Sequence, residues 1–200
     1  MVKYPLGHGP RKDFQKKTTK KTITYGSRGM SLEERLNNSN QYYLAHGLGI
    51  IHKKPTPIQV VKVDYPKRSA AKITEAYYRH ASTTDYNGVY KGFYVDFEAK
   101  ETRNKTSFPL SNLPEHQRDH MMACIHQGGI AFLIISFTAY DEIFLVPYQL
   151  INKYIQENNK QSISYEYIKE VGYICPTSFN PMIDYLKALD NYLETRVNSL

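Results

Sequence analysis

The sequence predicts an α/β domain in which helices flank a mixed β-sheet. The first observation is a continuous apolar run, Ile130–Phe137, which has the length of a strand that is covered on both faces. The second is that helix-start signals, at Ser31, Pro114 and Pro181, lie before and after this run along the chain. With 200 residues, 41% of them hydrophobic, the chain can bury one sizeable core.

The folded part of the chain is expected to begin with a helix over residues 31–45. Ser31 and Glu34 form a capping-box pattern, and the apolar residues after them fall on one side of a helix: Leu32, Leu36, Tyr43 and Leu44. Residues 47–51, Gly-Leu-Gly-Ile-Ile, then indicate a short strand.

The next part of the chain is predicted to lie away from the core. Residues 58–63 alternate as a strand does, whereas residues 69–79 contain helix formers but only a thin apolar face. Lys72, Tyr77, Tyr78 and Arg79 leave this second stretch basic and aromatic. Because a helix of this kind has little apolar surface to bury, we expect it to project from the body.

Residues 89–100 fit either a hairpin of two strands or one long strand. Pro114 then suits the first turn of a helix that ends near Gly128. The run Ile130–Phe137 is the expected centre of the sheet, and residues 142–147 are its expected partner.

The chain is expected to close with a helix capped by Asn180 and Pro181. Its apolar side would be formed by Ile183, Leu186, Leu189 and Leu193. There is no internal repeat and no sign of a second domain. Residues 28–200 are therefore predicted to form a single domain.

The positive charge is concentrated at the N-terminus. The chain has 26 Lys and Arg against 19 Asp and Glu, a formal charge of +7. Residues 1–28 hold eight basic residues and one acid, so residues 29–200 are formally neutral, and we expect residues 1–27 to be a disordered arm. Residues 51–105 carry a net +5 and residues 106–200 a net −4. An arm and a face of this kind bind phosphates, although basic tails also serve only for solubility.

Several classes of protein are disfavoured. No apolar run reaches the length of a membrane helix, and the first residues lack the apolar stretch of a secretory signal, so we expect a soluble, cytoplasmic protein without a membrane partner. Cys124 and Cys175 lie far apart, so both are expected to be reduced and at least partly buried. His116 and His120 have the spacing of zinc proteases but lack the glutamate that should follow the first histidine.

One strand segment carries ionisable side chains on a single face. Residues 93–100 alternate strictly, so that their apolar and polar side chains point to opposite faces of a sheet. The polar face holds Tyr94, Asp96, Glu98 and Lys100. Asp85 precedes this strand, and a turn at Gly88 would bring its carboxylate beside Glu98.

Two carboxylates held this close repel each other, and a hard divalent cation such as Mg²⁺ relieves the repulsion. Lys100 lies where it could stabilise charge on an attacked phosphate or help to activate water. These are the ingredients of metal-assisted phosphodiester hydrolysis. The alternative is an amphipathic edge strand whose Glu and Lys face solvent, and the spacing alone does not decide between the two.

The neighbouring residues leave further alternatives open. Asp96 could support the site from behind or form an ordinary salt bridge. Tyr86, Tyr90 and Tyr94 interleave with the charged residues and are candidate stacking or backbone contacts for a nucleic acid.

Six motifs resemble those of the RecU Holliday-junction resolvases, dimeric nucleases of the PD-(D/E)xK, restriction-endonuclease-like superfamily. They are SRGMSLE (27–33), HKKPTP (52–57), YPKRSAA (65–71), STTDYNG (82–88), VDFEAKET (95–102) and NKTSFPL (104–110). The resemblance covers most of residues 27–150. It implies a restriction-endonuclease-like core with a protruding stalk at about residues 58–81, which is thought to enter the open centre of a four-way junction.

The resemblance also implies a metal site. The ligands of Mg²⁺, for which Mn²⁺ could substitute, would be Thr83, Asp85, Glu98 and Gln117. Lys100 would stabilise the transition state, so that Asp85, Glu98 and Lys100 form the catalytic set. Gln117 shares a helix face with Met121, where a polar side chain that points at the core needs a partner.

The function that the resemblance implies is the resolution of Holliday junctions by paired symmetric nicks during recombination and repair. A homodimer would act on four-way junction DNA, with a recombinase and a branch-migration helicase as further partners. Two alternatives remain: a non-catalytic DNA-binding or junction-folding module, and a duplex endonuclease of the same superfamily. Intact Asp85, Glu98 and Lys100 argue against the first.

Overall fold

The computed structural model describes residues 30–79 and 83–197, and the predicted basic arm lies outside them. The body is built on a six-stranded sheet in the order β1-β4-β5-β7-β8-β10. Only β5 and β7 are parallel, and every other neighbouring pair is antiparallel, so the predicted mixed sheet is confirmed. The strands are β1 (Ile50–Lys53), β4 (Tyr86–Tyr90), β5 (Phe93–Thr102), β7 (Ile130–Phe137), β8 (Glu142–Pro147) and β10 (Tyr173–Ile174).

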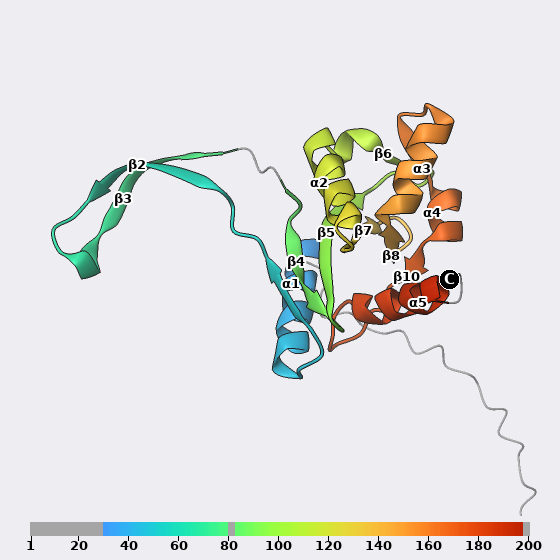
Figure 1. Cartoon of the computed structure of the whole chain (residues 1–200), viewed down its shortest axis with the longest axis horizontal. Coiled ribbons are helices and arrows are strands. Elements are labelled where there is room, and N and C mark those ends of the chain that lie inside the picture. Colours follow the sequence, from blue (N-terminus) through green and yellow to red (C-terminus); the bar gives the residue numbers. More distant parts are fainter. Residues whose placement is uncertain (1–29, 80–82, 198–200) are drawn as a thin grey trace, which may run out of the picture.

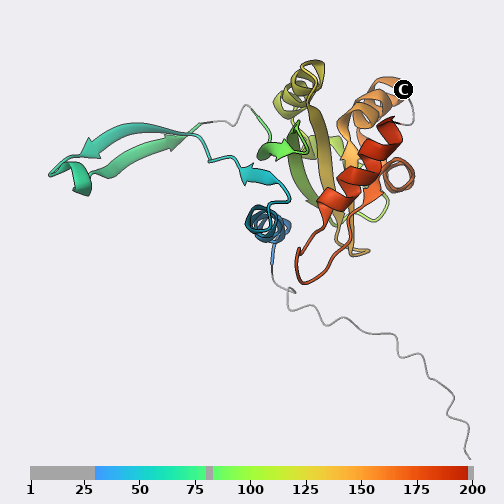
Figure 2. The same ribbon diagram turned by 60° about the horizontal axis from the view of Figure 1, so that its bottom comes forward.

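Helices cover both faces of this sheet (Figures 1 and 2). One face packs against α1 and α5, and the other against α2, α3 and α4. The helices are α1 (Leu32–Ala45), α2 (Glu115–His126), α3 (Tyr148–Asn158), α4 (Tyr165–Val171) and α5 (Tyr185–Val197). A small outer sheet pairs β6 (Ser107–Pro109) with β9 (Ser162–Ser164).

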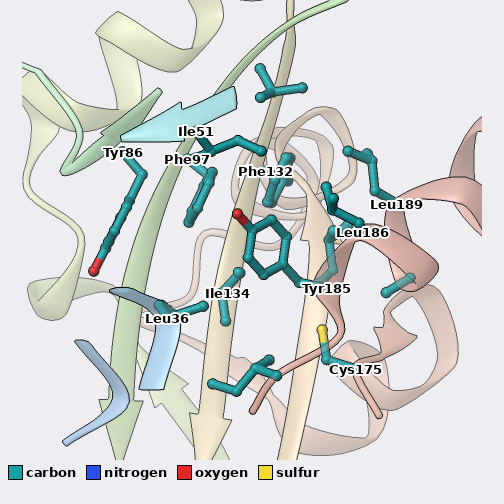
Figure 3. Close-up of a cluster of buried hydrophobic side chains, with 14 of the residues drawn as sticks. Leu36, Ile51, Tyr86, Phe97, Phe132, Ile134, Cys175, Tyr185, Leu186 and Leu189 are labelled. Atoms are coloured by element: carbon teal, nitrogen blue, oxygen red, sulfur yellow. The ribbon is translucent and has the colours of Figure 1, made fainter. Parts of the chain in front are cut away.

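The central strand β7 explains the continuous apolar run. All eight of its residues are buried, because alternate side chains enter the two cores on opposite faces of the sheet. Phe132 and Ile134 belong to the core under α1 and α5, and Leu133 and Ile135 to the core under α2, α3 and α4. Figure 3 shows the first core, in which Phe132 lies beside Phe97 and Tyr185. Each large apolar side chain buried in this way stabilises the fold by about 1.5–3 kcal/mol.

Helix α1 begins as predicted. Ser31 is its N-cap, with both bonds of the capping box: the Glu34 amide donates to Ser31 Oγ, and the Ser31 amide donates to Glu34 Oε2 at 2.8 Å. The assignment of Leu44 to the buried side was wrong, because its side chain is half exposed. The following strand starts later than predicted, at Ile50, since the chain first turns through Gly47 with φ +64°.

Strands β2 (Ile58–Asp64) and β3 (Lys72–Tyr78) form an antiparallel ribbon that extends from the body (Figure 1). A short 3-10 turn, Arg68–Ala70, joins them. The helix expected over residues 69–79 was wrong. Residues 72–78 instead pair with β2, which satisfies their backbone hydrogen-bonding groups without a core to cover them. Nearly every residue of the two strands is exposed, as the thin apolar pattern indicated.

The predicted pairing of Asp85 with the charged strand is achieved by a different turn. Strands β4 and β5 form a hairpin, one of the two forms expected for residues 89–100, and it turns at Lys91 and Gly92, where φ is positive. Gly88 is not a turn residue: it lies inside β4 opposite Val95. A Cβ there would come within 2.0 Å of the Ile50 carbonyl oxygen, so glycine is required for β1 to pair with β4.

The later helices largely follow the sequence signals. Helix α2 starts after Pro114 and ends before Gly128, as predicted. Helix α5 starts only at Tyr185, after Asp184, whose carboxylate accepts a bond from the Lys187 amide as an N-cap does; the start predicted at Pro181 was wrong.

Both predicted strands around the sheet centre, β7 and β8, are present and paired. Within residues 30–79 and 83–197, no helix is long and apolar enough to cross a membrane.

Candidate active site

Strand β5 separates an apolar face from a charged one. Val95 and Phe97 are buried in the core under α1 and α5, and the Phe97 ring stacks at 4.8 Å on that of Tyr86. Asp96 and Glu98 point to the opposite face, yet both are fully buried. The alternative of a solvated charged face is therefore wrong for these two carboxylates. Buried ionisable groups need compensating partners, so their surroundings decide what this face can do.

Asp85 and Glu98 are brought together as predicted. The hairpin register pairs Tyr86 with Phe97, which sets the residues before and after them side by side. The Asp85 amide donates to Glu98 Oε2 at 2.9 Å. On the other carboxylate oxygen, Lys100 Nζ lies 2.6 Å from Glu98 Oε1. Asp85, Glu98 and Lys100 thus form one contiguous group.

Burial raises the pKa of Glu98 to about 7, although the neighbouring Lys100 lowers it; the charge of Asp85 adds to the rise. The protonated form of Glu98 is thus more populated near neutral pH than in an ordinary glutamate. A cation bound between the two carboxylates would reverse this shift, because it stabilises both negative charges.

The charge of Glu98 should therefore limit the stability of the metal-free protein, and Glu98→Gln is expected to be more stable than the wild type above pH 7. The folded-state pKa lies above the usual 4.5, so the stability that Glu98 contributes is fully present below about pH 4.5 and is lost as the pH rises through about 7. Gln avoids this loss, an advantage on the order of 1–3 kcal/mol at pH 8. Urea unfolding in EDTA at pH 5 and pH 8 measures it. An advantage of equal size at both pH values would contradict the raised pKa.

Gln117 and Thr83 differ in how far they match the implied ligand set. Gln117 lies on α2, which covers the charged face of β5, and it is 7% exposed. Among the residues that the structure describes, its buried Oε1 has no hydrogen-bond partner, as is expected of an oxygen that binds a cation. Thr83 is half-buried and its hydroxyl donates to the Thr84 carbonyl at 3.3 Å. These oxygen donors, with the two carboxylates, fit a hard cation such as Mg²⁺.

Asp96 forms the salt bridge considered above and also accepts several hydrogen bonds. Its Oδ2 accepts bonds from Lys54 Nζ and the Tyr94 hydroxyl, both at 2.8 Å, and lies 3.2 Å from His120 Nε2. Its Oδ1 accepts a bond from the Thr84 hydroxyl. Sequence reasoning found neither Lys54 nor Thr84, because Lys54 reaches Asp96 only when β1 pairs with β4, and Thr84 only when β4 pairs with β5. The HKKPTP motif, which contains Lys54, was the available signal.

A second group of possible metal ligands lies beside this network. One ligand atom each from Asp96, His120 and Cys124 falls within 4.8 Å of the others. The ammonium group of Lys54 already lies there, 2.8 Å from Asp96 Oδ2 and 3.4 Å from His120 Nε2, and supplies the positive charge. His116 is exposed, in agreement with the weak zinc signal of the histidine pair. Cys124 and Cys175 are both free, as expected.

A pocket of about 660 Å³ opens in front of Asp85. Its lining comes from the end of β1, the base of the ribbon and the segment 83–85. The basic side chains Lys53, Lys54 and Arg79 line the pocket together with the acidic Glu33 and Asp85, and Lys53 is paired with Glu33 on α1. The lining thus has one more basic than acidic side chain, so the pocket can hold an anionic group beside Asp85.

The three interleaved tyrosines have different positions. Tyr86 and Tyr90 are buried in the core, so the idea that they contact a nucleic acid was wrong. Tyr94 is 40% exposed, but its hydroxyl is bonded to Asp96. Burial raises the pKa of Tyr94 to about 12, so the hydroxyl keeps the proton that it donates.

A mixed sheet that carries a buried Glu98 next to Asp85, a lysine in contact with Glu98 and a pocket with basic side chains in front of Asp85 is typical of the class of metal-dependent enzymes that act on phosphodiesters. The chain belongs to the RecU family: the family model described as "Recombination protein U" matches residues 27–191. This match extends beyond residue 150, where the recognisable motifs end.

Several relatives are similar to this chain over almost its whole length. A protein of Leuconostoc citreum is 56% identical over 200 residues, covering 96% of this chain and 98% of its own. A protein of Lactobacillus helveticus is 49% identical over 210 residues, covering all of both chains. One of Bacillus cereus is 52% identical over 193 residues, covering 94% of this chain and 96% of its own. All three are named Holliday junction resolvase RecU.

Proposed function

We propose that the chain is a Mg²⁺-dependent endodeoxyribonuclease that resolves Holliday junctions by paired symmetric nicks during recombination and repair. The observation that carries the proposal is the contiguous group of Asp85, Glu98 and Lys100 in a member of the RecU family. The names of the relatives support the substrate. A non-catalytic junction-binding module would not need a buried carboxylate whose pKa is raised.

The residues proposed to hold the cation are Thr83, Asp85, Glu98 and Gln117. When bound, Mg²⁺ or Mn²⁺ supplies the Lewis acidity that activates water and stabilises negative charge on the phosphate. Support comes from the oxygen chemistry of the four side chains and from the unpaired Gln117 Oε1 among the described residues.

Lys100 is proposed to act on the phosphate itself. Its side chain is partly exposed and held at Glu98, so it can donate to a non-bridging oxygen on which charge grows. The products would be a 5′-phosphate and a 3′-hydroxyl. The basic side chains of the pocket, Lys53 and Arg79, are suited to hold the DNA backbone next to the scissile bond.

The finer architecture follows from the same proposal. Residues 28–200 form one nuclease domain with a restriction-endonuclease-like core, and the ribbon of β2 and β3 is the stalk that enters the junction centre. A homodimer suits a junction with two-fold symmetry, because each subunit presents one site to one of two equivalent strands. We place the protein in the cytoplasm, with a recombinase and a branch-migration helicase as partners.

A cleavage assay tests the proposal. A synthetic four-way junction and its matching linear duplex are incubated with Mg²⁺ or EDTA, and the cut position is read on each strand. Symmetric Mg²⁺-dependent cuts in one opposed pair of strands, absent from the duplex, are the expected result. Equal cutting of the duplex would instead favour a general duplex endonuclease, and binding without cuts under Mg²⁺ or Mn²⁺ would favour the non-catalytic module.

Deleting residues 1–26 is expected to weaken junction binding and to flatten its dependence on salt. The segment contains seven Lys and Arg and one acid, so its loss removes up to about six phosphate contacts. Fluorescence anisotropy with labelled junction at several salt concentrations gives the slope of log K against log[salt]. An unchanged slope would show that the arm does not contact DNA.

A further inference from the structure

Asp96 is the most heavily bonded buried side chain of the candidate site. It is fully buried, and four side chains from four parts of the chain converge on its two oxygens: Lys54, Thr84, Tyr94 and His120. Satisfied buried networks of this kind fix one arrangement of the groups that take part. The side-chain hydrogen bonds of Asp96 are with these four residues, and none of the four is a proposed metal ligand.

Two of its partners act on the segment that carries Asp85. Thr84 is the residue immediately before Asp85, and its hydroxyl donates to Asp96. Lys54 holds the same segment at two points: its amide donates to the Asp85 carbonyl at 2.7 Å, and its Nζ donates to Thr84 Oγ1 at 3.0 Å. The segment is thus fixed by Asp96 both directly and through Lys54.

The same segment sets the distance between the two proposed acidic ligands. The Asp85 amide reaches Glu98 at 2.9 Å only because residues 83–85 lie against β5. On the ribbon side, the last backbone bond before this segment joins the Arg79 amide to the Pro57 carbonyl. Between that bond and β4, the described bonds to the body are those of Thr84 with Asp96 and Lys54, that of the Asp85 carbonyl with the Lys54 amide, and that of the Asp85 amide with Glu98.

The position of Lys54 depends on the negative charge of the Asp96 carboxylate. Lys54 Nζ is largely buried and is paired with Asp96. Taking away one member of a buried ion pair leaves the other uncompensated, so that Lys54 would move towards the open pocket if Asp96 lost its charge. Thr84 would then lose both of the bonds that hold its hydroxyl to these two side chains.

We infer that Asp96 is a positioning residue: its carboxylate holds Thr84 and Lys54 so that the segment 83–85 carries Asp85 to Glu98. The inference builds on the proposed function, because it assigns the purpose of this network to the metal site. Asp96 acts through its neighbours and takes no part as a ligand.

The test compares Asp96→Asn with Tyr185→Phe. Asn keeps the size of the side chain, and Tyr185→Phe serves as the matched control because it removes a buried hydroxyl bond, to Asn40, in the core on the opposite face of the sheet. Hydrogen exchange of the Asp85 and Lys54 amides is measured by NMR in the metal-free proteins, relative to the amides of β7. Calorimetric titration with Mg²⁺ gives the affinity without any cutting.

In Asp96→Asn we expect these two amides to exchange about tenfold faster relative to β7, and Mg²⁺ to bind about 10–100-fold more weakly. Tyr185→Phe should lower overall stability and change neither quantity. If Asp96→Asn behaves like Tyr185→Phe in both, the inference is overturned.

A second variant tests the same link if Asp96→Asn does not fold. Thr84→Val preserves shape and leaves the Asp96–Lys54 pair in place, so it should speed exchange at Asp85 but not at Tyr86, whose amide lies in β4. Unchanged exchange at Asp85 would contradict the direct link from Asp96. Because exchange is measured without metal or DNA, a protein that fails to cut junctions would refute the proposed function while still deciding this inference.

Discussion

Glu98→Gln is expected to reduce junction cutting by about 10³-fold or more while leaving junction affinity within about twofold of the wild type. The Glu98 carboxylate is a proposed metal ligand and contacts both Asp85 and Lys100. Gln offers a weaker oxygen ligand and carries no charge. DNA affinity is proposed to depend instead on basic groups such as Lys53 and Arg79, which this substitution does not change. Single-turnover cleavage and anisotropy measure the two quantities.

The matched control for this change is Glu166→Gln, which removes one negative charge from an exposed position on α4. It should cut at the wild-type rate. If Glu98→Gln retains substantial cutting, or loses binding as severely as cutting, then Glu98 is not a metal ligand in the way proposed. The gain in metal-free stability expected of the same variant separates a chemical defect from a folding defect.

Shortening the ribbon is expected to abolish the preference for four-way junctions over linear duplex. The register pairs Val60 with Ala76, so residues 61–75 can be replaced by Asn-Gly, which suits a two-residue hairpin turn. The described residues removed are almost all exposed, and the body should therefore fold as before. Competition between junction and duplex in binding and cleavage gives the preference, which should fall to about equal use of both substrates.

Charge must be controlled in this experiment, because residues 61–75 include four basic and two acidic residues, a net +2. The control is a ribbon of full length in which Lys62 and Lys72 are both replaced by Gln. This variant should bind all DNA more weakly yet keep its preference for junctions. A preference that survives the shortening, or disappears in the charge control, would refute a role for the shape of the ribbon.

Local patterns were sufficient for most of the body. The capping box at Ser31, the apolar run of β7 and the alternation of β5 each determine their element with little help from the rest of the chain. Prediction failed at β3, where the decision between helix and strand depended on a partner strand rather than on the segment's own composition. Gly88 was misread for a similar reason, since its neighbour Ile50 comes from a distant part of the chain.

Some features of the candidate site could likewise be predicted from local patterns, and others could not. The strand period alone puts Glu98 and Lys100 on one face, whereas the neighbourhood of Asp85 and Glu98 was predicted from a turn at Gly88 that the structure places at Lys91 and Gly92. The burial of Glu98, and the network of Asp96 with Lys54 and Thr84, could not be found in this way because α2 and β1 create them in space. A charged residue on an alternating strand has the same pattern whether water or a helix covers it.

Strand β5 has one apolar and one charged face, so its register determines both whether the protein folds and whether the candidate site forms. A slip of one residue against β4 or β7 would exchange its faces, sending Asp96 and Glu98 into the core in which Phe97 otherwise stacks on Tyr86 and Phe132. Uncompensated carboxylates cannot remain there, so such a chain would unfold rather than persist. A misaligned molecule would therefore be eliminated before it could act as a poorly selective nuclease.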